Sequence, residues 1–391
     1  MKFIVNRLLM YEAVKTVLKA VSSNREIPEI GGILIDADAD SGMLTLTGTD
    51  IRTHIQRRLR LEHIKESGNI IVAPILVNML RLLEGEAVEF NAERGLVTLH
   101  SGSCCYTISY LETKAFPKLQ IPFPEDTIQI TGINSLIKRT IFAADEKVTD
   151  PQKAALSYVK LSFQNGMTTA EATDGSCVAV AASPHCADGE LEITLHEKAL
   201  NILNSTVKPD DVLYAGIVGK YAVLMKEDMF FSSMMFAGKP LNFDRILDEI
   251  QTIYKATVDA RQFYELAIGL SAVLSATDDH CVDLWIEADS VRFQVKTERC
   301  TSSSHIQAKA TVPTPEEGFH YQAKLLIDCL HHLVGPVQLG IDRRGFALLE
   351  GNGCRYCICP RGPARITTRN DSHKENTPKS KKAKTVTAKA A

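Results

Sequence analysis

The sequence predicts an α+β protein built from three similar domains, and three observations lead to that prediction. The chain has 391 residues, which exceeds one ordinary hydrophobic core and corresponds to roughly two to four domains. Amphipathic stretches with helical periodicity recur at intervals of about 125 residues, the sign of a repeated architecture. Each segment also ends in three closely spaced β-type runs. We therefore expect domains at 1–124, 125–250 and 251–365.

The composition is that of a globular protein without a dominant charge. The chain is 45% hydrophobic and 23% charged, with a net charge of −3, so any surface for nucleic acid must be local. The N-terminal stretch contains Arg7, Glu12 and Lys15, so it lacks the apolar core of a signal peptide. No window has the length of apolar sequence that a membrane span needs. We expect a cytoplasmic protein.

Each segment is expected to contain two helices. In the first helix, Met10, Val14, Val17 and Val21 recur at helical spacing, which predicts one buried stripe. The first helices are expected at 6–21, 133–146 and 260–275, and the second helices at 73–85, 196–206 and 322–335.

Three strands are expected after every second helix, because alternating β-type runs are separated there by turn residues. The runs lie within 87–111, 212–236 and 337–360, and turn sequences such as "NAERG", "RRG" and "NG" separate them. Proline-bearing joints, "AFPKLQIPFP" and "AGKPLNFDRI", then end the first two segments. The expected plan is helices followed by an antiparallel meander, repeated.

A Thr-Asp corner occurs in equivalent places in the first two segments, at Thr49–Asp50 in "LTLTGTDIRTHI" and Thr173–Asp174 in "TTAEATDGSCVAVAA". A catalytic pair has no reason to repeat with a domain. A turn whose aspartate accepts hydrogen bonds from nearby backbone amides does. We expect both corners to be structural.

Sites for catalysis, metals or cofactors are not predicted. The cluster Cys354, Cys357 and Cys359 has the spacing of half a zinc site, but no second pair accompanies it. Cys357 and Cys359 fall on the same face of a strand, so a buried stripe is favoured. The aspartates of "IDADADSG" imitate half of a calcium loop without its later ligands. No nucleophile elbow or nucleotide fingerprint is present. These observations indicate a non-enzymatic scaffold or binding protein without a cofactor.

Several short stretches in order give the chain a specific resemblance. "MKFIVNR", "IPEIGGILI", "LTLTGTDI", "AFPKL", "ATDG" and "YCICP" resemble the bacterial DNA polymerase III β subunit, the sliding clamp, from residue 1 to about 363. The resemblance implies a DNA clamp fold, with three topologically alike domains per chain and two chains in a ring around double-stranded DNA. It also implies a non-catalytic processivity factor for DNA replication. An ATP-driven clamp loader would open the ring.

The resemblance also implies three sets of binding residues. Those facing DNA are Arg25, Arg81, Lys138, Lys153 and Lys198. Those of a groove that docks peptides of polymerases and clamp loaders are Leu156, Thr173, Gly175, Val178, Leu241, Arg245, Ile246, Arg344, Phe346, Ile358 and Pro360. Those of the homodimer interface are Tyr106, Ile108, Leu111, Val273 and Leu274. The first corner is expected to echo the second without lining a groove.

Departures from the family pattern suggest altered partners. Ser176 and Cys177 stand where the family has His-Arg, and Arg344 and Phe346 replace smaller residues, which changes the volume and charge of the groove. An alternative function is that of a divergent clamp-like protein, a paralogue or mobile-element product, that binds a polymerase or loader without encircling DNA. Residues 366–391 are lysine-rich and are expected to form a disordered tail that adds salt-sensitive attraction to DNA.

Overall fold

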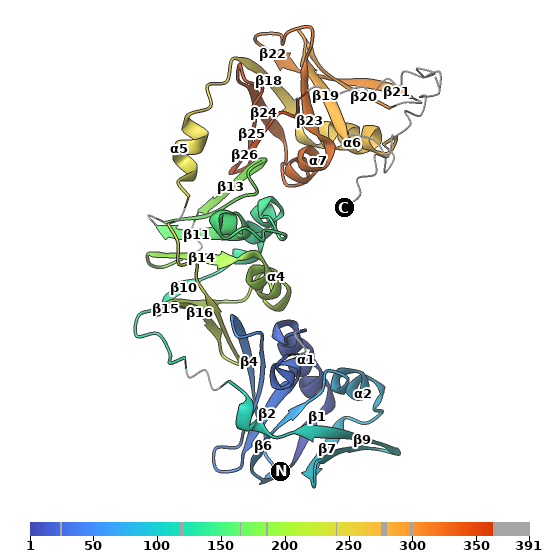
Figure 1. Cartoon of the computed structure of the whole chain (residues 1–391), viewed down its shortest axis with the longest axis vertical. Helices are drawn as coiled ribbons and strands as arrows, with labels where there is room; N and C mark the ends of the chain where they lie inside the picture. The colour runs from blue at the N-terminus through green and yellow to red at the C-terminus, as the bar shows by residue number, and fades with distance from the viewer. Residues whose placement is uncertain are drawn as a thin grey trace, which may run out of the picture.

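The computed structural model is an arc with helices along its concave side and sheets along its convex side (Figure 1). It describes residues 1–23, 26–117, 121–164, 166–184, 187–239, 241–274, 280–297 and 300–362. The predicted tail at 366–391 lies outside these ranges. Within them, no helix combines the length and apolar character that crossing a membrane requires.

The same order of elements occurs three times. The first repeat contains β1 (Lys2–Asn6), α1 (Arg7–Val17), β2 (Ile33–Asp38), β3 (Met43–Thr49), β4 (Thr53–Arg60), β5 (Ile64–Glu66), β6 (Gly68–Val72), α2 (Leu76–Leu82), β7 (Ala87–Glu93), β8 (Leu96–Ser101) and β9 (Cys104–Leu111). The second contains β10 (Ile128–Ile130), α3 (Ile133–Thr140), a 3-10 helix (Pro151–Ser157), β11 (Tyr158–Gln164), β12 (Met167–Thr173), β13 (Cys177–Pro184), β14 (Leu191–His196), α4 (Glu197–Thr206), β15 (Leu213–Val218), β16 (Tyr221–Lys226) and β17 (Met229–Met234).

The third repeat follows a short helix, α5 (Phe243–Asp248), which lies on the convex side (Figure 1). This repeat contains β18 (Tyr254–Asp259), α6 (Ala260–Ser271), β19 (Cys281–Ile286), β20 (Ser290–Lys296), β21 (Thr301–Gln307), β22 (Lys309–Ala310), β23 (Phe319–Gln322), α7 (Ala323–His331), β24 (Pro336–Ile341), β25 (Ala347–Gly351) and β26 (Cys354–Ile358).

The six amphipathic helices are confirmed, with shorter bounds than the periodicity predicts. Side-chain caps define several starts: Asn6 Oδ1 accepts from the Leu8 and Leu9 amides at 3.0 and 3.1 Å, and Asp259 Oδ1 accepts from the Gln262 amide at 3.0 Å. Such caps satisfy amide groups that have no partner inside the helix. α5 was not predicted, because its six residues are too few to show a helical period.

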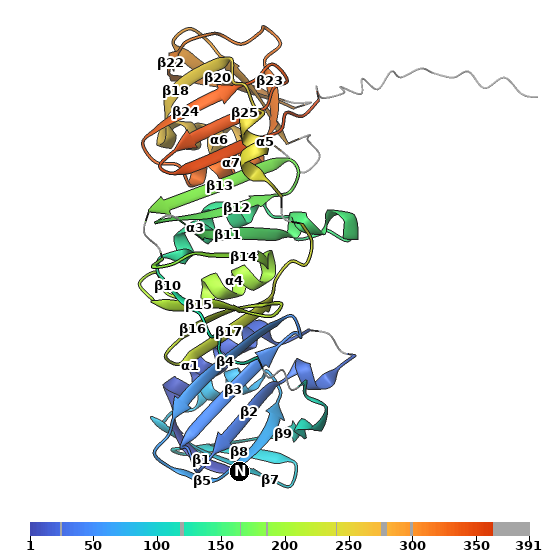
Figure 2. The same ribbon diagram turned by 90° about the vertical axis from the view of Figure 1, so that its left-hand side faces the viewer.

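The sheets join the repeats to one another. In the largest sheet, β4 of the first repeat pairs antiparallel with β17 of the second, and in the next sheet β13 pairs with β26 of the third (Figure 2). The two junctions have the same register, since Met229 lies opposite Arg57 and Cys354 lies opposite Ala181. Continuous hydrogen-bonded sheets therefore hold the three repeats in one arc.

The core lies between the sheets and the concave helices. Large side chains such as Phe3, Phe90, Phe163, Phe231 and Phe293 have no exposed surface. A second, smaller cluster lies on the convex side where α5 covers the junction of β13 and β26. The helices are thus fixed from behind by the core and present their outer faces to the hollow of the arc.

Candidate DNA and peptide interfaces

The concave helices of the second repeat form the clearest cationic surface. Lys138 on α3 and Lys198 on α4 are exposed, while the one acidic residue of these two helices, Glu197, is buried. Neither lysine forms an ion pair within the described chain. Both charges are available to phosphate groups in the hollow.

Cations on the third-repeat helices are already neutralised in part. Arg261 pairs with Glu265 at 2.8 Å, and Lys324 pairs with Asp328 at 2.6 Å. These surface pairs are weak. They nevertheless lower the local positive potential of the third-repeat helices.

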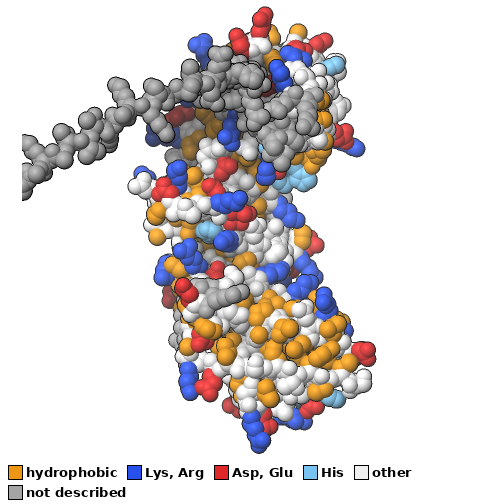
Figure 3. Space-filling view, turned by 45° about the vertical axis from the view of Figure 1, so that its right-hand side comes forward, with side chains coloured by type: hydrophobic (Ala, Val, Ile, Leu, Met, Phe, Trp, Pro, Cys, Tyr) orange, Lys and Arg blue, Asp and Glu red, His pale blue; other side chains and the backbone are white. Residues whose placement is uncertain are grey.

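The first repeat presents an apolar concave surface. Leu8 and Leu9 of α1 are 59% and 57% exposed, and Ile75 and Leu82 beside or within α2 are 52% and 57% exposed. Figure 3 shows hydrophobic side chains gathered over this end of the molecule. This surface was not predicted from the sequence, although four leucine or isoleucine side chains off the buried stripe were its signal. Arg81 is the exposed cation of α2.

The predicted DNA-facing residues do not all lie on this row of helices. Arg81, Lys138 and Lys198 do. Lys153 is exposed on the 3-10 helix Pro151–Ser157, which projects at one edge of the arc (Figure 2). Arg25 lies outside the described residues.

Both Thr-Asp corners are structural turns, as expected. Asp50 Oδ1 accepts from the Arg52 and Thr53 amides at 3.0 and 2.6 Å, and Asp174 Oδ1 accepts from the Ser176 and Cys177 amides at 2.7 Å each. In both corners one carboxylate oxygen accepts two backbone amides and so holds the turn.

The third repeat has an unrecognised version of the same corner. The Thr297 hydroxyl accepts from the Cys300 amide at 3.0 Å, and the Thr297 amide donates to the Cys300 carbonyl at 2.8 Å. Threonine supplies one acceptor oxygen where the other corners have a carboxylate. The changed residue type concealed this copy in the sequence.

Many of the predicted groove residues gather where β13 and β26 meet under α5. Val178 belongs to the convex cluster, and Leu241, Ile246 and Phe346 pack against it while remaining partly exposed.

Other predicted groove residues lie around the second corner and on α5. Gly175 has φ +86, and a Cβ added there would lie 3.9 Å from the Leu156 side chain. Arg245 is exposed on α5, and Thr173 is buried, its hydroxyl bonded to the Cys177 carbonyl. The second Thr-Asp corner thus borders the exposed surface of the convex cluster.

Arg344 is held at this surface by a buried acid. Asp342, 4% exposed, accepts from the Arg344 side chain at 2.9 Å and from the Arg344 and Phe346 amides at 2.8 and 2.9 Å. The Arg344 guanidinium lies over the Phe346 ring, 4.8 Å from its centroid. The fixed guanidinium still has free donors, since Arg344 is itself exposed.

Ile358 lies on the other face of its strand. It is fully buried in the main core, whereas its neighbour Cys357 belongs to the convex cluster. Because side chains alternate along a strand, Cys357 and the half-exposed Cys359 take the groove face, with Pro360 beside Gly345. The groove residue implied by the resemblance at this position is therefore wrong by one residue, because Ile358 faces the main core.

Two strand edges at opposite ends of the arc have no neighbour in the described chain. Residues 104–109 of β9 pair only with β8, and β21 pairs only with β20. Tyr106 and Ile108 are partly buried against the core, while Leu111 and Val273 are 47% and 40% exposed, with Leu274 partly buried. The predicted interface residues therefore divide between the two ends of the molecule.

The described cysteines are not gathered into a metal-binding group. In the described ranges, no group of three or more His, Cys, Asp or Glu side chains is arranged to hold an ion. Cys354 and Cys357 are buried, and burial raises the pKa of the Cys357 thiol. The aspartates of "IDADADSG" form a polar hairpin turn in which Asp38 accepts from the Asp40 amide and the Ser41 hydroxyl.

Comparisons with known proteins agree with this geometry. Residues 1–120 match the family model described as DNA polymerase III beta subunit, N-terminal domain. The beta sliding clamp of Halalkalibacterium halodurans is 28% identical over 289 residues, which are 69% of this chain and 75% of the relative. The beta sliding clamp of Bacillus subtilis is 23% identical over 351 residues, covering 86% and 91% of the two chains.

Solved structures confirm the clamp fold. The DNA polymerase III beta subunit of Thermotoga maritima superposes with a TM-score of 0.83 at 17% identity, covering 93% of this chain and 100% of the other. The DNA polymerase sliding clamp of Bacillus subtilis gives 0.82 at 21% identity, covering 93% and 99%.

Proposed function

We propose that this chain, a divergent relative of the bacterial DNA polymerase III β subunits, is a sliding clamp. Two copies close into a ring that encircles double-stranded DNA and tethers a DNA polymerase for processive synthesis. The protein is a non-catalytic cytoplasmic replication factor, and its domains divide near residues 124, 250 and 365.

One observation carries the proposal: each repeat already joins the next through the same pair of strands. The last strand of the second repeat pairs with β4, and the last strand of the third pairs with β13. By that rule, β9 of one copy meets β21 of a second. One open edge belongs to the last strand of a repeat and the other to the strand that follows a corner, as at the internal junctions, so two copies can pair each β9 with a β21 and leave neither of these two edges free.

The junctions also define the expected register. Cys104 is the first residue of β9, just as Met229 is the first residue of β17 and Cys354 is the first residue of β26. Thr301 lies as many residues after Thr297 as His54 lies after Asp50 and Val178 lies after Asp174. Cys104 is then expected opposite Ser304 of the second copy, and Cys105 opposite Ser303. All eight residues of β9, and six of the seven residues of β21, all but His305, are uncharged types.

Helix ends support the same closure. At the two internal junctions, the segment after a first helix contacts the end of a second helix: the Lys19 ammonium donates to the Ser205 carbonyl, and Phe142 stacks on His332 at 5.6 Å. At closure, Val273 would meet Leu82 of the second copy. Both side chains are exposed and apolar in the single chain, as the core of an interface requires.

For DNA we propose Arg81, Lys138 and Lys198 as the phosphate-facing residues, with Lys153 near the edge of the hole. A ring held by topology needs only weak, sequence-independent attraction. Peptides of a polymerase and a clamp loader would dock on the surface formed by Val178, Leu241, Ile246, Arg344 and Phe346. The exposed guanidinium of Arg344 favours acidic peptides there.

The test is retention on DNA with and without free ends. Protein loaded by a clamp loader onto nicked circular plasmid should remain bound through gel filtration and leave when a restriction enzyme linearises the plasmid. Equal retention on circular and linear DNA would refute encirclement.

The apolar concave surface at Leu8, Leu9 and Ile75 favours one alternative, a clamp-like protein that binds a polymerase or loader without encircling DNA. The mass of the particle in solution distinguishes the two. A dimer supports the ring, whereas a monomer that still binds a loader supports the alternative.

A further inference from the structure

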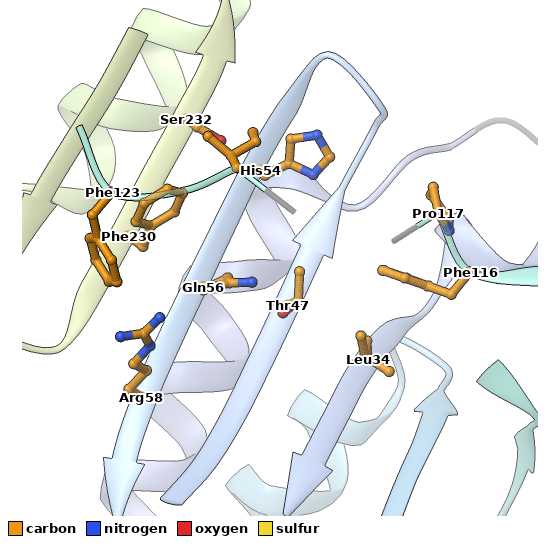
Figure 4. Close-up of a pocket in the computed structure, with 11 residues that line it drawn as sticks. Leu34, Thr47, His54, Gln56, Arg58, Phe116, Pro117, Phe123, Phe230 and Ser232 are labelled. Carbon is orange, nitrogen blue, oxygen red and sulfur yellow. The ribbon is translucent and has the colours of Figure 1, made fainter. Parts of the chain in front are cut away.

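A second pocket lies on the convex side where the first two repeats join. It is a cavity of about 130 Å³ whose floor is made by β2, β3, β4 and β17, and the connector after β9 forms its walls (Figure 4). Phe116 and Pro117 stand on one side, and Phe123 and Phe230 stand on the other. A cavity of this size holds one side chain rather than a whole small molecule, since pockets for such molecules measure roughly 300 Å³ or more.

The pocket occupies the place in the first junction that the proposed groove occupies in the second. His54 is opposite Ser232 across the first junction, as Val178 is opposite Cys357 across the second. Both His54 and Val178 also pair with the threonine of their own Thr-Asp corner. The inference rests on the proposed function in this respect alone, that the second junction is a peptide groove.

The chemistry of the first junction differs from that of the second. Where α5 and apolar side chains fill the convex surface of the second junction, the first has the polar residues His54, Gln56 and Ser232. The Ser232 side chain has no exposed surface, and its hydroxyl has no hydrogen-bond partner in the described chain. A buried hydroxyl without a partner is unfavourable, and a ligand that reaches it would remove that cost.

A cation lies at the mouth of the pocket. The Arg58 guanidinium lies 5.3 Å from the centroid of the Phe123 ring, which in turn contacts Phe230 edge-on at 5.8 Å. Stacking on an aromatic ring orients a guanidinium and leaves its edge donors free for a carboxylate. Arg58 forms no ion pair with an acidic side chain of the described chain, unlike its neighbour Arg57, which pairs with Asp228.

We infer that this pocket is a second docking site for a linear peptide of a partner protein, which inserts one aliphatic or aromatic side chain beside Leu34 and Phe116 and places an adjacent carboxylate on Arg58. The charge on Arg58 selects an acidic peptide. The apolar walls, and a volume that fits one side chain, select an aliphatic or aromatic residue next to the acidic one. Ser232 and Gln56 supply hydrogen bonds to the peptide backbone.

The test uses an array of fluorescein-labelled hexapeptides in which Leu, Ile or Phe is next to Glu, and a matched array with Gln in place of Glu. Binding to the full-length protein is followed by fluorescence anisotropy. Glu peptides should bind, and Arg58→Gln should weaken them about tenfold or more, the effect of losing a hydrogen bond to a charged group. Arg60→Gln, on the same strand and face but outside the pocket, should have no effect.

A second pair of variants separates the two peptide surfaces. Phe123→Ala should reduce Glu-peptide binding, and Arg344→Gln should leave the Arg58-dependent part unchanged. Equal binding of the Glu and Gln arrays, or equal affinities for the Arg58→Gln and Arg60→Gln proteins, would overturn the inference. Retention on circular DNA, measured on the same variants, tests only the ring. If no peptide binds at the pocket, this measurement still decides whether the protein is a clamp.

Discussion

A single cysteine substitution tests both the dimer and its register. If the outer junction repeats the inner two, Cys105 of one copy faces Ser303 of the other, and both positions are exposed on the same side of the sheet. Directly opposed residues of antiparallel strands have Cα atoms about 4.5–5.5 Å apart, which is within the range of a disulfide. Ser303→Cys should therefore give a covalent dimer linked at two symmetry-related places when a mild oxidant accepts the thiol electrons.

The proposed register also predicts which cysteine positions are too far from Cys105 to form a disulfide. In Gln307→Cys the new thiol is four residues further along, about 13 Å at roughly 3.3 Å per residue, which no disulfide spans. The unaltered protein has Cys300 three positions from the site opposite Cys105, about 10 Å away by the same spacing. Non-reducing electrophoresis over a time course should show rapid linkage for Ser303→Cys alone. If Ser303→Cys and Gln307→Cys link at equal rates, the proposed register is refuted.

Three further predictions concern charge, pH and the repeated corner. Lys138→Gln with Lys198→Gln should reduce the salt slope of binding to linear duplex DNA by about 2, because each phosphate contact contributes about 0.9; an unchanged slope in filter binding would place the DNA elsewhere. Burial lowers the pKa of His332 to about 4, below its unfolded value of about 6.5, so its stabilisation is complete above pH 6.5 and is lost as the pH falls towards 4. The pKa shift limits the contribution of His332 to the free energy of unfolding to about 3 kcal/mol. Solvent screening of this half-exposed ring reduces it to about 1–2 kcal/mol, and His332→Gln should remove that pH dependence from urea unfolding. Asp174→Ala should cost about 1.5–3 kcal/mol, the value of hydrogen bonds to a charged acceptor; a loss below about 0.5 kcal/mol, the lower end for any hydrogen bond, would show that the corner does not depend on its carboxylate.

The parts of the fold that local patterns encode could be predicted from the sequence. Six helices followed from apolar spacing, and the strands of the meanders followed from alternation and turn residues. The role of Asp50 and Asp174 followed from their repetition. The joining of β4 to β17 could not be predicted in this way, because it brings together residues far apart in the sequence, such as Thr53 and Ser233, and leaves no local periodicity.

The binding surfaces were less predictable for a related reason. A residue role implied by a resemblance holds only if the strand is aligned so that the same side chains face the groove. At Ile358 the alignment is shifted by one position, which selected a residue of the main core in place of Cys357 or Cys359. The pocket at Arg58 and Ser232 was invisible because its residues come from four separate strands and a connector. The Thr297 corner was missed because a different residue type performs the same hydrogen bonding.

Salt should act differently on the two interactions that a sliding ring needs. In the proposed ring, attraction to phosphate would depend on the unpaired cations of the second repeat and weaken steeply as salt rises. In the proposed ring, closure would by contrast join the uncharged residues of β9 to the nearly uncharged β21 and bring together apolar side chains such as Leu82 and Val273. Hydrophobic burial and strand pairing have no comparable dependence on ionic strength. A loaded ring should therefore stay on circular DNA at salt concentrations that remove the protein from linear DNA, because enclosure persists after attraction is lost.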